Sequence, residues 1–313
     1  MRLSRREFGS LTLGSVAGLA LADIALAAAP AVPAGAIDCH NHIVGPQAKY
    51  PMAANRTYTP PEASVAQLKT LRMQTGASRN VIVQPSFYGF DNSCLLDAMA
   101  ELGNSVRGIA VVQQTVSDAE LQRLARAGVV GVRLNLATAG VRDPKVAIDA
   151  INGFAPRFKA LNWHIQINTD IAIVPAIAQT VGSLSVPVVF DHMANLEAEK
   201  GASQPGFGAL VELVRGGNTY VKLSAPYNLS KRPDYSDVIP LAKALVAARA
   251  DRMLWGTNWP HPGNARGLPL GEISPYQVVD NPNLMRVLEQ EVPDAAMRKM
   301  ILVDTPARVY RFT

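Results

Sequence analysis

Short apolar runs alternate with amphipathic segments along most of the chain. Each run is rich in Val, Ile and Leu and stops at a Gly, Pro or polar residue, a pattern typical of buried strands. The runs that we expect to form strands are 36–42, 80–84, 106–112, 129–134, 164–168, 186–191, 219–223 and 253–256. The segments expected to form helices are 65–75, 92–102, 118–127, 145–161, 174–181, 207–215, 238–248, 283–290 and 293–302. Strands that alternate with helices predict parallel strands joined by crossovers, and eight such units favour an α/β fold, a single (β/α)8 barrel over residues 36–313.

One connection in this pattern is unusually long. The segment 46–61 is rich in proline and carries Tyr50, Arg56 and Tyr58. A loop of this length inside a compact domain often covers a functional site. We therefore expect it to lie over one end of the barrel.

Residues 1–29 have a different character and are kept out of the barrel. The pair Arg5-Arg6 precedes a moderately apolar run, 11–22, and Ala25-Leu26-Ala27 fits a cleavage site. This arrangement is typical of a twin-arginine export signal. A membrane anchor is the alternative, but the apolar run is short for a bilayer span. We expect a periplasmic protein with no stable membrane association after the signal is removed.

Composition narrows the choice of partners. The 313 residues include 30 Lys and Arg against 25 Asp and Glu, a net charge of +5, without a run of basic residues. This pattern disfavours a nucleic-acid partner and suits an anionic small molecule. The two cysteines, Cys39 and Cys94, are too few for a disulfide framework, and their pairing stays open. The sequence does not indicate an oligomeric state.

Polar side chains stand where the predicted strands end. In a (β/α)8 barrel the catalytic groups sit at the carboxyl ends of the strands, so these residues should converge. They are His40, His42, Ser86, Arg133, Asn168, His192, Ser224 and Asn258. Alternation places His40 and His42 on one face of the first strand, and imidazoles that converge there suit a metal, an oxyanion or proton transfer. Asp191 directly precedes His192, so we expect it to face away from the site and to orient rather than react.

Several of these residues also have a purely structural interpretation. Arg133 can pair with a structural carboxylate, and Tyr58 and Ser86 can pack or cap a loop. His164 begins its strand, at the opposite end from the site, and is expected to be structural. His261 lies next to a proline and can stand at the rim or behind the site.

Motifs spread over the chain resemble the amidohydrolase superfamily, specifically its metal-independent, lactone-processing branch. The matching segments follow the order of that family and span nearly the whole chain after residue 37. They are Asp38-Cys39-His40-Asn41-His42, Tyr58-Thr59-Pro60, Val83-Gln84-Pro85-Ser86, Gly131-Val132-Arg133-Leu134-Asn135, Asp191-His192-Met193, Trp255-Gly256-Thr257-Asn258-Trp259-Pro260-His261 and Pro306-Ala307-Arg308-Val309-Tyr310.

The chain departs from the family pattern at three positions. Asn258 stands where the resemblance implies an aspartate that activates water, and an amide has no useful basicity. Asn168 stands where metal-dependent members carry a histidine. Imidazoles combined with amides make a poor zinc site, so we expect neither a catalytic metal nor a cofactor. Asn228 stands where a relative in this branch carries an arginine, which leaves Arg133 as the clearest carboxylate clamp and suits a substrate with one carboxylate.

The resemblance combined with Asn258 implies a lactone isomerase. The expected reaction converts a sugar-diacid 1,5-lactone, of the D-galactaro-1,5-lactone type, into the 1,4-lactone. An internal hydroxyl makes the attack, because its effective concentration can reach roughly 10⁵ M or more. In this hypothesis His40, His42 and His192 polarise the carbonyl, and His192 also transfers the proton.

The remaining site residues are expected to bind the substrate. Arg133 holds the free carboxylate, assisted by Tyr58 and Ser86, with Asn168 and Ser224 as further contacts. Two alternatives stay open. One is a lactone hydrolase with a histidine base, and the other is an exported lactone-binding protein without catalytic activity.

Overall fold

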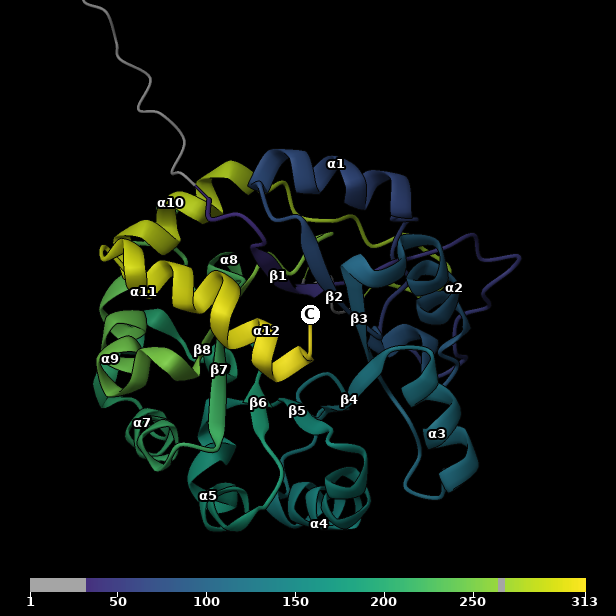
Figure 1. Ribbon diagram of the computed structural model, residues 1–313, viewed down its shortest axis with the longest axis horizontal. Coiled ribbons are helices and arrows are strands. Elements are labelled where there is room, and N and C mark those ends of the chain that lie inside the picture. The colour runs from purple at the N-terminus through teal and green to yellow at the C-terminus, as the bar shows by residue number, and fades with distance from the viewer. Residues whose placement is uncertain (1–31, 264–267) are drawn as a thin grey trace, which may run out of the picture.

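Eight parallel strands form a ring at the centre of the molecule, surrounded by helices (Figure 1). The computed structural model describes residues 32–263 and 268–313. The strands, each paired with the next one in sequence, are β1 (Ile37–Asn41), β2 (Arg79–Val83), β3 (Val106–Ala110), β4 (Val129–Asn135), β5 (His164–Asn168), β6 (Val188–Phe190), β7 (Thr219–Ser224) and β8 (Met253–Gly256). The predicted (β/α)8 barrel is therefore confirmed.

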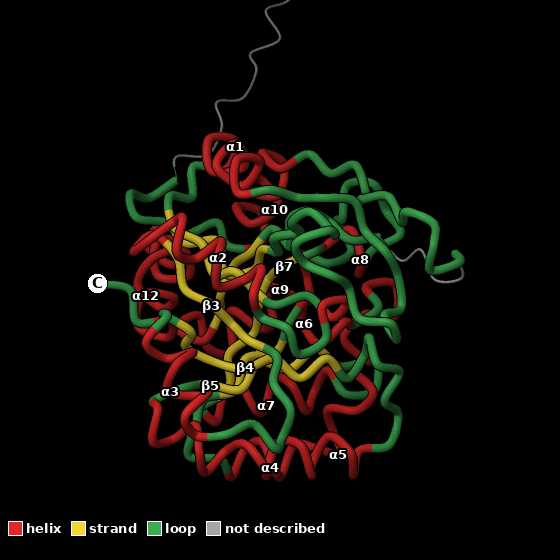
Figure 2. The backbone as a smooth tube through the Cα atoms, turned by 90° about the vertical axis from the view of Figure 1, so that its right-hand side faces the viewer, coloured by secondary structure: helices red, strands yellow, loops and turns green. Residues whose placement is uncertain are grey.

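The helices form an outer layer around these strands (Figure 2). Their bounds are α1 (Val65–Thr75), α2 (Ser93–Leu102), α3 (Asp118–Arg126), α4 (Pro144–Leu161), α5 (Val174–Ser183), α6 (His192–Asn195), α7 (Phe207–Gly216), α8 (Pro226–Leu229), α9 (Ile239–Arg249), α10 (Asn281–Glu291), α11 (Ala295–Lys299) and α12 (Thr305–Tyr310). Local chemistry sets the ends of α1. Ser64 and Gln67 form a reciprocal capping box at its start, and Gly76 ends it with a left-handed φ of 74°.

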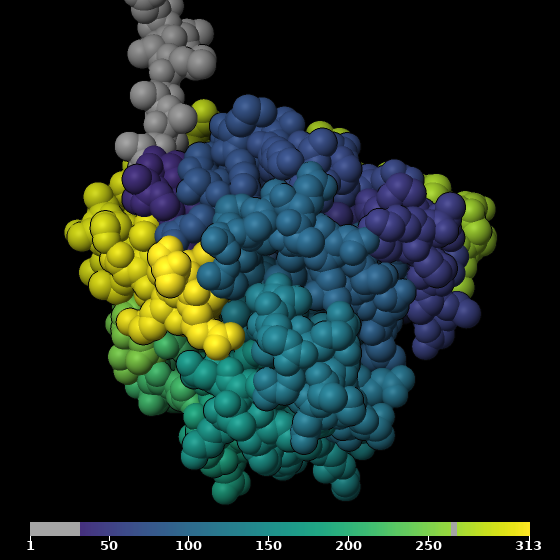
Figure 3. Space-filling view, turned by 45° about the vertical axis from the view of Figure 1, so that its right-hand side comes forward, coloured from purple at the N-terminus to yellow at the C-terminus, as the bar shows by residue number. Residues whose placement is uncertain are grey.

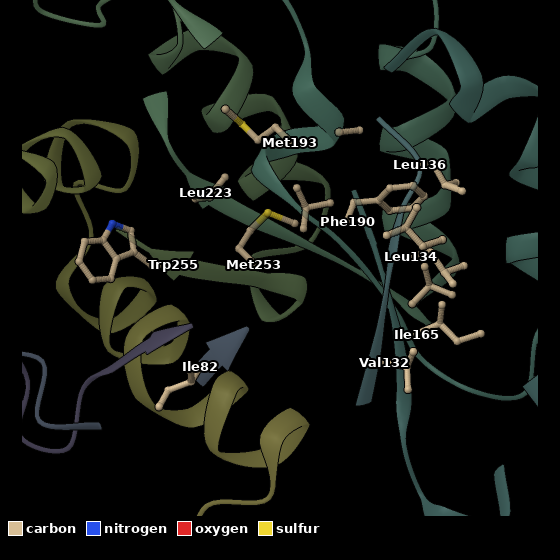
Figure 4. Packing of buried hydrophobic residues seen from close by; sticks show 14 of the residues in the cluster. Ile82, Val132, Leu134, Leu136, Ile165, Phe190, Met193, Leu223, Met253 and Trp255 are labelled. Carbon is tan, nitrogen blue, oxygen red and sulfur yellow. The ribbon is translucent and has the colours of Figure 1, made fainter. Parts of the chain in front are cut away.

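Apolar side chains pack in two layers, one on each side of the strands. The larger layer fills the space between strands and helices, where Leu134, Phe190 and Trp255 lie (Figure 4). The smaller layer joins residues near the starts of the strands, such as Ile37 and Leu254, to Tyr310 and Phe312 at the end of the chain. The C-terminal segment thus covers the end of the barrel opposite the strand carboxyl ends, beside the first described residues (Figure 3).

Asp38 joins the first strand to the last and so completes the ring. Its carboxylate accepts hydrogen bonds from the backbone N–H of Thr257 at 3.0 Å and from the Thr257 hydroxyl at 2.7 Å. Just beyond, the N–H of Asn258 donates to the carbonyl of His40 at 2.9 Å. The strands approach so closely that a Cβ on Gly256 would lie 2.9 Å from the Cβ of His40. Glycine is therefore needed at position 256 for His40 to occupy its place.

The long loop 46–61 is tied to the loop that follows β8. Arg56 and Thr59 both donate to the carbonyl of Leu270, and the N–H of Ser274 donates to the carbonyl of Thr59 at 2.7 Å. Two connections far apart in sequence are thereby held together beside the strand ends. Among the described helices, none is long and apolar enough to cross a membrane. The export segment predicted at residues 1–29 lies outside the described residues.

Candidate active site at the carboxyl ends of the strands

Three histidines lie in contact at the carboxyl ends of β1 and β6. The ring centres of His40 and His42 are 4.9 Å apart, and those of His40 and His192 are 4.5 Å apart. All three side chains are buried. The shared face predicted for His40 and His42 is therefore present, and His192 joins them from a segment about 150 residues away along the chain.

A backbone carbonyl fixes the proton of His42. Its Nδ1 lies 2.7 Å from the oxygen of Val83, and a carbonyl can only accept, so Nδ1 carries the proton. Burial, assisted by the positive charge of Arg133, lowers the pKa of His42 to about 4. The side chain is therefore neutral at neutral pH, and its Nε2 carries a lone pair that can accept a proton.

His192 owes its position to an unusual backbone turn. Residues His192, Met193, Ala194 and Asn195 have positive φ angles of 49°, 48°, 56° and 50°. Such a left-handed run costs roughly 1–2 kcal/mol per residue and persists only where its surroundings impose it. Nδ1 of His192 lies 2.7 Å from the Ser224 hydroxyl, and burial lowers the pKa of this histidine to about 3. This strained turn directs the imidazole of His192 back towards His40 on β1.

The same turn overturns the orientation predicted for Asp191. The expectation that Asp191 faces away from the site assumed that strand alternation continues to His192. Instead β6 ends at Phe190, and Asp191 points into the barrel, fully buried beneath His40. Although burial alone would raise the pKa of Asp191, the adjacent Lys222, His40 and Arg133 hold it well below its usual value. Asp191 is therefore an ionised carboxylate inside the barrel.

Asp191 is the anion in a buried cluster of charged groups. Its Oδ2 accepts from Nε of Arg133 at 2.8 Å and from Nε2 of Gln166 at 3.1 Å. Its Oδ1 lies 3.2 Å from Nζ of Lys222. Two cations and one anion leave a net charge of +1 beneath the histidines, which favours binding of an anion.

Sequence reasoning missed Lys222 and Gln166. Each lies between two apolar residues within a short strand, Lys222 in Thr-Tyr-Val-Lys-Leu-Ser and Gln166 in His-Ile-Gln-Ile-Asn. A charged or amide side chain inside a strand that is otherwise apolar was the available signal, because such a group is buried only with partners. Without knowing that β5, β6 and β7 bring these residues to one point, those partners could not be named.

The surroundings of Arg133 are compatible with both roles considered from the sequence, a structural ion pair and a clamp for the substrate carboxylate. Its Nε pairs with Asp191, which is the structural interpretation. Among the described residues, no hydrogen bond or ion pair engages its two terminal nitrogens. The side chain is 5% exposed. One edge of the guanidinium is therefore held in place while the other is available to a carboxylate.

Asn258 is held by a chain of hydrogen bonds that leads away from the histidines. Its Nδ2 donates to the Tyr227 hydroxyl at 3.1 Å, and that hydroxyl lies 3.0 Å from Nδ1 of His261. Nε2 of His261 lies 2.8 Å from Oδ1 of Asn281. With Nδ2 committed to Tyr227, the side-chain oxygen Oδ1 of Asn258 remains as an acceptor that no donor among the described residues engages. His261, predicted at the rim or behind the site, stands behind Asn258.

The other residues predicted for the site differ in how many of their polar atoms already have partners in the protein. Both ends of the Asn168 amide are occupied, by the Thr138 hydroxyl at 3.1 Å and by Nδ2 of Asn195 at 2.8 Å. Tyr58 packs edge-on against Phe87 with ring centres 5.4 Å apart, and burial raises its pKa to about 12. Ser86 is half-buried and begins a short 3-10 turn, three residues after the end of β2.

His164 lies at the start of β5, where it packs edge-on against Tyr310 with ring centres 5.2 Å apart. This is the covered end of the barrel, so His164 is structural, as predicted from its place in the strand.

The histidines make stability fall in acid. Burial lowers the pKa of every histidine in the chain below 6.5. Between pH 6.5 and about 4 the unfolded chain binds protons that the native protein does not, so the free energy of unfolding decreases as the pH falls. Each histidine contributes about 1.4 kcal/mol per pH unit, and two buried acids with raised pKa, Asp38 and Glu291, oppose it. Urea unfolding at several pH values measures this slope, and His164→Phe should reduce it by about one proton. An unchanged slope in that variant would contradict the neutral state of the buried histidines.

The donor set does not fit a metal ion. Among the described residues, no group of three or more His, Cys, Asp and Glu side chains has a spacing that could hold one. Nδ1 of His42 is taken by Val83, and Asp191 is taken by Arg133, Gln166 and Lys222. The strands that end in Asn168 and Asn258 offer neutral amides, which suit harder ions than zinc. We therefore derive no step through a metal.

The chain is similar to known proteins over nearly its whole described length. It matches the model of the amidohydrolase family over residues 37–312. It is 37% identical to 2-pyrone-4,6-dicarboxylate hydrolase of Comamonas testosteroni over 89% of this chain and 91% of that protein. It is 26% identical to D-galactarolactone isomerase of Agrobacterium fabrum over 91% of this chain and 94% of that protein. The crystal structure of a probable 2-pyrone-4,6-dicarboxylic acid hydrolase from Acinetobacter baumannii, with citric acid bound, superimposes with a TM-score of 0.74 at 26% identity and covers 89% of this chain and 100% of that one. The motifs and the barrel thus agree with the comparisons, and the chain belongs to the amidohydrolase family.

Proposed function

We propose that the protein hydrolyses the lactone ring of an anionic substrate. The observation that carries the proposal is the buried excess of positive charge, from Arg133 and Lys222 against Asp191, directly beneath three neutral imidazoles. A carboxylate of the substrate would offset this charge while the imidazoles surround the reacting carbonyl. The similarity to 2-pyrone-4,6-dicarboxylate hydrolase supports the same chemistry.

The geometry supplies a base for the attacking water. Nε2 of His42 carries a lone pair at neutral pH and can take a proton from water as its oxygen adds to the lactone carbonyl. The C–O bond of the ring then breaks, and the imidazolium returns the proton to the departing ring oxygen. With a pKa of about 4, His42 is a weak base, so most of the catalysis must come from orientation and charge.

A second candidate reaction is the isomerisation of a sugar-diacid 1,5-lactone to the 1,4-lactone. Asn258 favours it, because its amide cannot deprotonate water, yet its free carbonyl oxygen can accept a hydrogen bond from a substrate hydroxyl and aim it. The similarity to D-galactarolactone isomerase points the same way at lower identity. Both reactions share the carbonyl site and differ only in the nucleophile.

One experiment separates these reactions. The protein is incubated in H₂¹⁸O with 2-pyrone-4,6-dicarboxylate and, separately, with D-galactaro-1,5-lactone, and products are followed by NMR and mass spectrometry. Hydrolysis gives an open-chain acid that contains ¹⁸O, as we expect for the pyrone. Isomerisation gives a 1,4-lactone without the label. Binding of either compound without turnover would contradict an enzymatic function and favour a lactone-binding protein.

Arg133 should be needed for recognition of the substrate carboxylate. Arg133→Met removes a charge-assisted contact with the substrate carboxylate, so we expect a loss of roughly 2–5 kcal/mol in kcat/KM. Arg133→Lys should recover only part, because an ammonium lacks the planar fork. The control is Arg142→Met, which breaks the exposed ion pair with Asp170 and should leave kinetics unchanged. Wild-type kinetics in a folded Arg133→Met protein would assign Arg133 to structure alone.

A further inference from the structure

Lys222 is a buried cation whose charge the proposed reaction uses but whose hydrogen bonds it leaves without a role. It lies on β7 with no exposed surface, and its Nζ reaches three acceptor atoms on three other strands or strand ends. The acceptors are Oε1 of Gln166 at 2.7 Å, Oδ1 of Asp191 at 3.2 Å and Nδ1 of His40 at 3.2 Å. A lysine ammonium has three protons and no acceptor. Two of these contacts, to Gln166 and His40, have hydrogen-bond geometry, whereas Oδ1 of Asp191 contributes charge without an aligned hydrogen bond. The contact with His40 is a hydrogen bond only on the condition that Nδ1 accepts.

This condition settles the protonation of His40. Nδ1 of His40 also lies 3.2 Å from Oδ1 of Asp191, and a proton on Nδ1 could be offered to that carboxylate. However, Oδ1 of Asp191 is not aligned with any hydrogen-bond donor, whereas the contact between Nζ and Nδ1 has hydrogen-bond geometry. A proton on Nδ1 would also leave one ammonium proton facing another donor in a buried site, which costs about 1–3 kcal/mol. Nδ1 therefore accepts, and the imidazole proton lies on Nε2.

Nε2 of His40 then carries the ring proton but has no acceptor for it among the described residues. It is buried, and no protein group among the described residues forms a hydrogen bond with it. A buried donor without a partner costs free energy in the resting protein. It gains a partner when a carbonyl oxygen of the substrate enters, and the bond strengthens as negative charge develops on that oxygen.

We propose that Lys222 is a positioning residue that holds His40 in the Nε2–H tautomer, so that His40 and His42 offer the substrate one donor and one acceptor. Val83 fixes the opposite tautomer in His42 from 2.7 Å. The two rings lie 4.9 Å apart, so a lactone carbonyl can receive the proton of one while its nucleophile gives a proton to the other. This division of roles rests on the proposed lactone chemistry, but the tautomers themselves do not depend on any substrate.

The tautomers can be read directly from the resting protein. The chain has five histidines, so a long-range ¹H–¹⁵N spectrum is tractable, and His40→Gln and His42→Gln assign the two sets of signals. Near neutral pH we expect His40 to show a bare Nδ1 and a protonated Nε2, and His42 to show the reverse. A protonated Nδ1 on both histidines would overturn the proposal, whatever the activity of the protein.

Two substitutions at position 222 then separate the hydrogen bond from the charge. Lys222→Met and Lys222→Gln remove the same positive charge, but the glutamine amide can still donate to Nδ1 of His40. In Lys222→Met we expect the His40 proton to move to Nδ1, towards Asp191, and kcat for 2-pyrone-4,6-dicarboxylate to fall about 10²–10³-fold, as when one oxyanion donor is lost. Lys222→Gln should keep the wild-type ¹⁵N pattern and retain most of kcat, while both variants raise KM.

The outcomes distinguish this inference from the proposed function. Equal kcat in the two variants, or a protonated Nε2 that persists in Lys222→Met, would show that Lys222 does not set the tautomer. If the wild-type protein does not act on either lactone, the proposed function fails. The ¹⁵N pattern of the wild-type protein and of Lys222→Met still decides the role of Lys222 in that case.

Discussion

Replacement of Asp191 by asparagine should lower the free energy of unfolding by about 3–5 kcal/mol. Asp191 is the only acidic residue in direct contact with Arg133 and Lys222 within the described part of the chain, at 2.8 and 3.2 Å, and both cations are buried. Removal of the carboxylate leaves two positive charges close together without a counter-ion. A loss of this size is a large share of the 5–15 kcal/mol typical of a folded domain, so it should be evident in urea unfolding.

The double variant tests this explanation. Adding Lys222→Met to Asp191→Asn returns the cluster to its original net charge, so we expect part of the lost stability to be recovered, with a coupling of roughly 0.5–3 kcal/mol. Asp97→Asn is the matched control, because its ion pair with Lys49 is exposed and should contribute no more than about 1 kcal/mol. An effect of Asp191→Asn as small as that of the control would mean that the Asp191 carboxylate is not needed to stabilise the two buried cations.

The fold could be predicted because hydrophobic periodicity and capping agree along the chain. The bounds predicted for 65–75, 164–168 and 253–256 are those of α1, β5 and β8. Each segment has a clear local stop, such as Gly76 after α1, whose left-handed φ suits glycine. Other bounds shifted by one or a few residues, as for β6, which is shorter than the run 186–191 because the chain leaves the sheet before Asp191.

Strand alternation failed where the backbone becomes irregular. The register between β1 and β2 shifts between Asp38 and Asn41, and the chain beyond β6 is left-handed from His192 to Asn195. Neither feature has a glycine or proline signal in the sequence. The left-handed angles from His192 to Asn195 are strained, and strained angles of this kind tend to lie at functional sites. Hence the residue type and strand-end position of the histidines predicted that they belong to the site, while the direction of the Asp191 side chain was predicted wrongly.

The buried cluster of charged groups could not be predicted from the sequence, because its contacts also depend on the tertiary structure. Its members, Arg133, Gln166, Asp191 and Lys222, come from four consecutive strands, β4 to β7, or from the residue just after them. Each has a plausible isolated interpretation, and only the closed barrel brings them within hydrogen-bond distance. The resemblance to a family located the reacting groups, but it did not reveal the support beneath them.

Asn258→Asp should shift the products towards open-chain acid, with hydrolysis faster by about 10²–10⁴-fold, the contribution of a well-placed general base. Aspartate is nearly isosteric with asparagine and is ionised at neutral pH unless strongly perturbed. Asn258 now donates to the Tyr227 hydroxyl, whereas a carboxylate can only accept. The Tyr227 proton would therefore turn from His261 towards the new carboxylate, which leaves its second oxygen free to take a proton from water.

The control for this change is Asn228→Asp, which adds the same charge at a half-buried residue bonded to Gln277 and should leave the products unaltered. Both variants are compared with the parent by NMR of D-galactaro-1,5-lactone and 2-pyrone-4,6-dicarboxylate. If the product ratio of Asn258→Asp matches that of the parent, water activation does not limit the reaction. His42 would then suffice as the base, and Asn258 would serve only to hold Tyr227 in place.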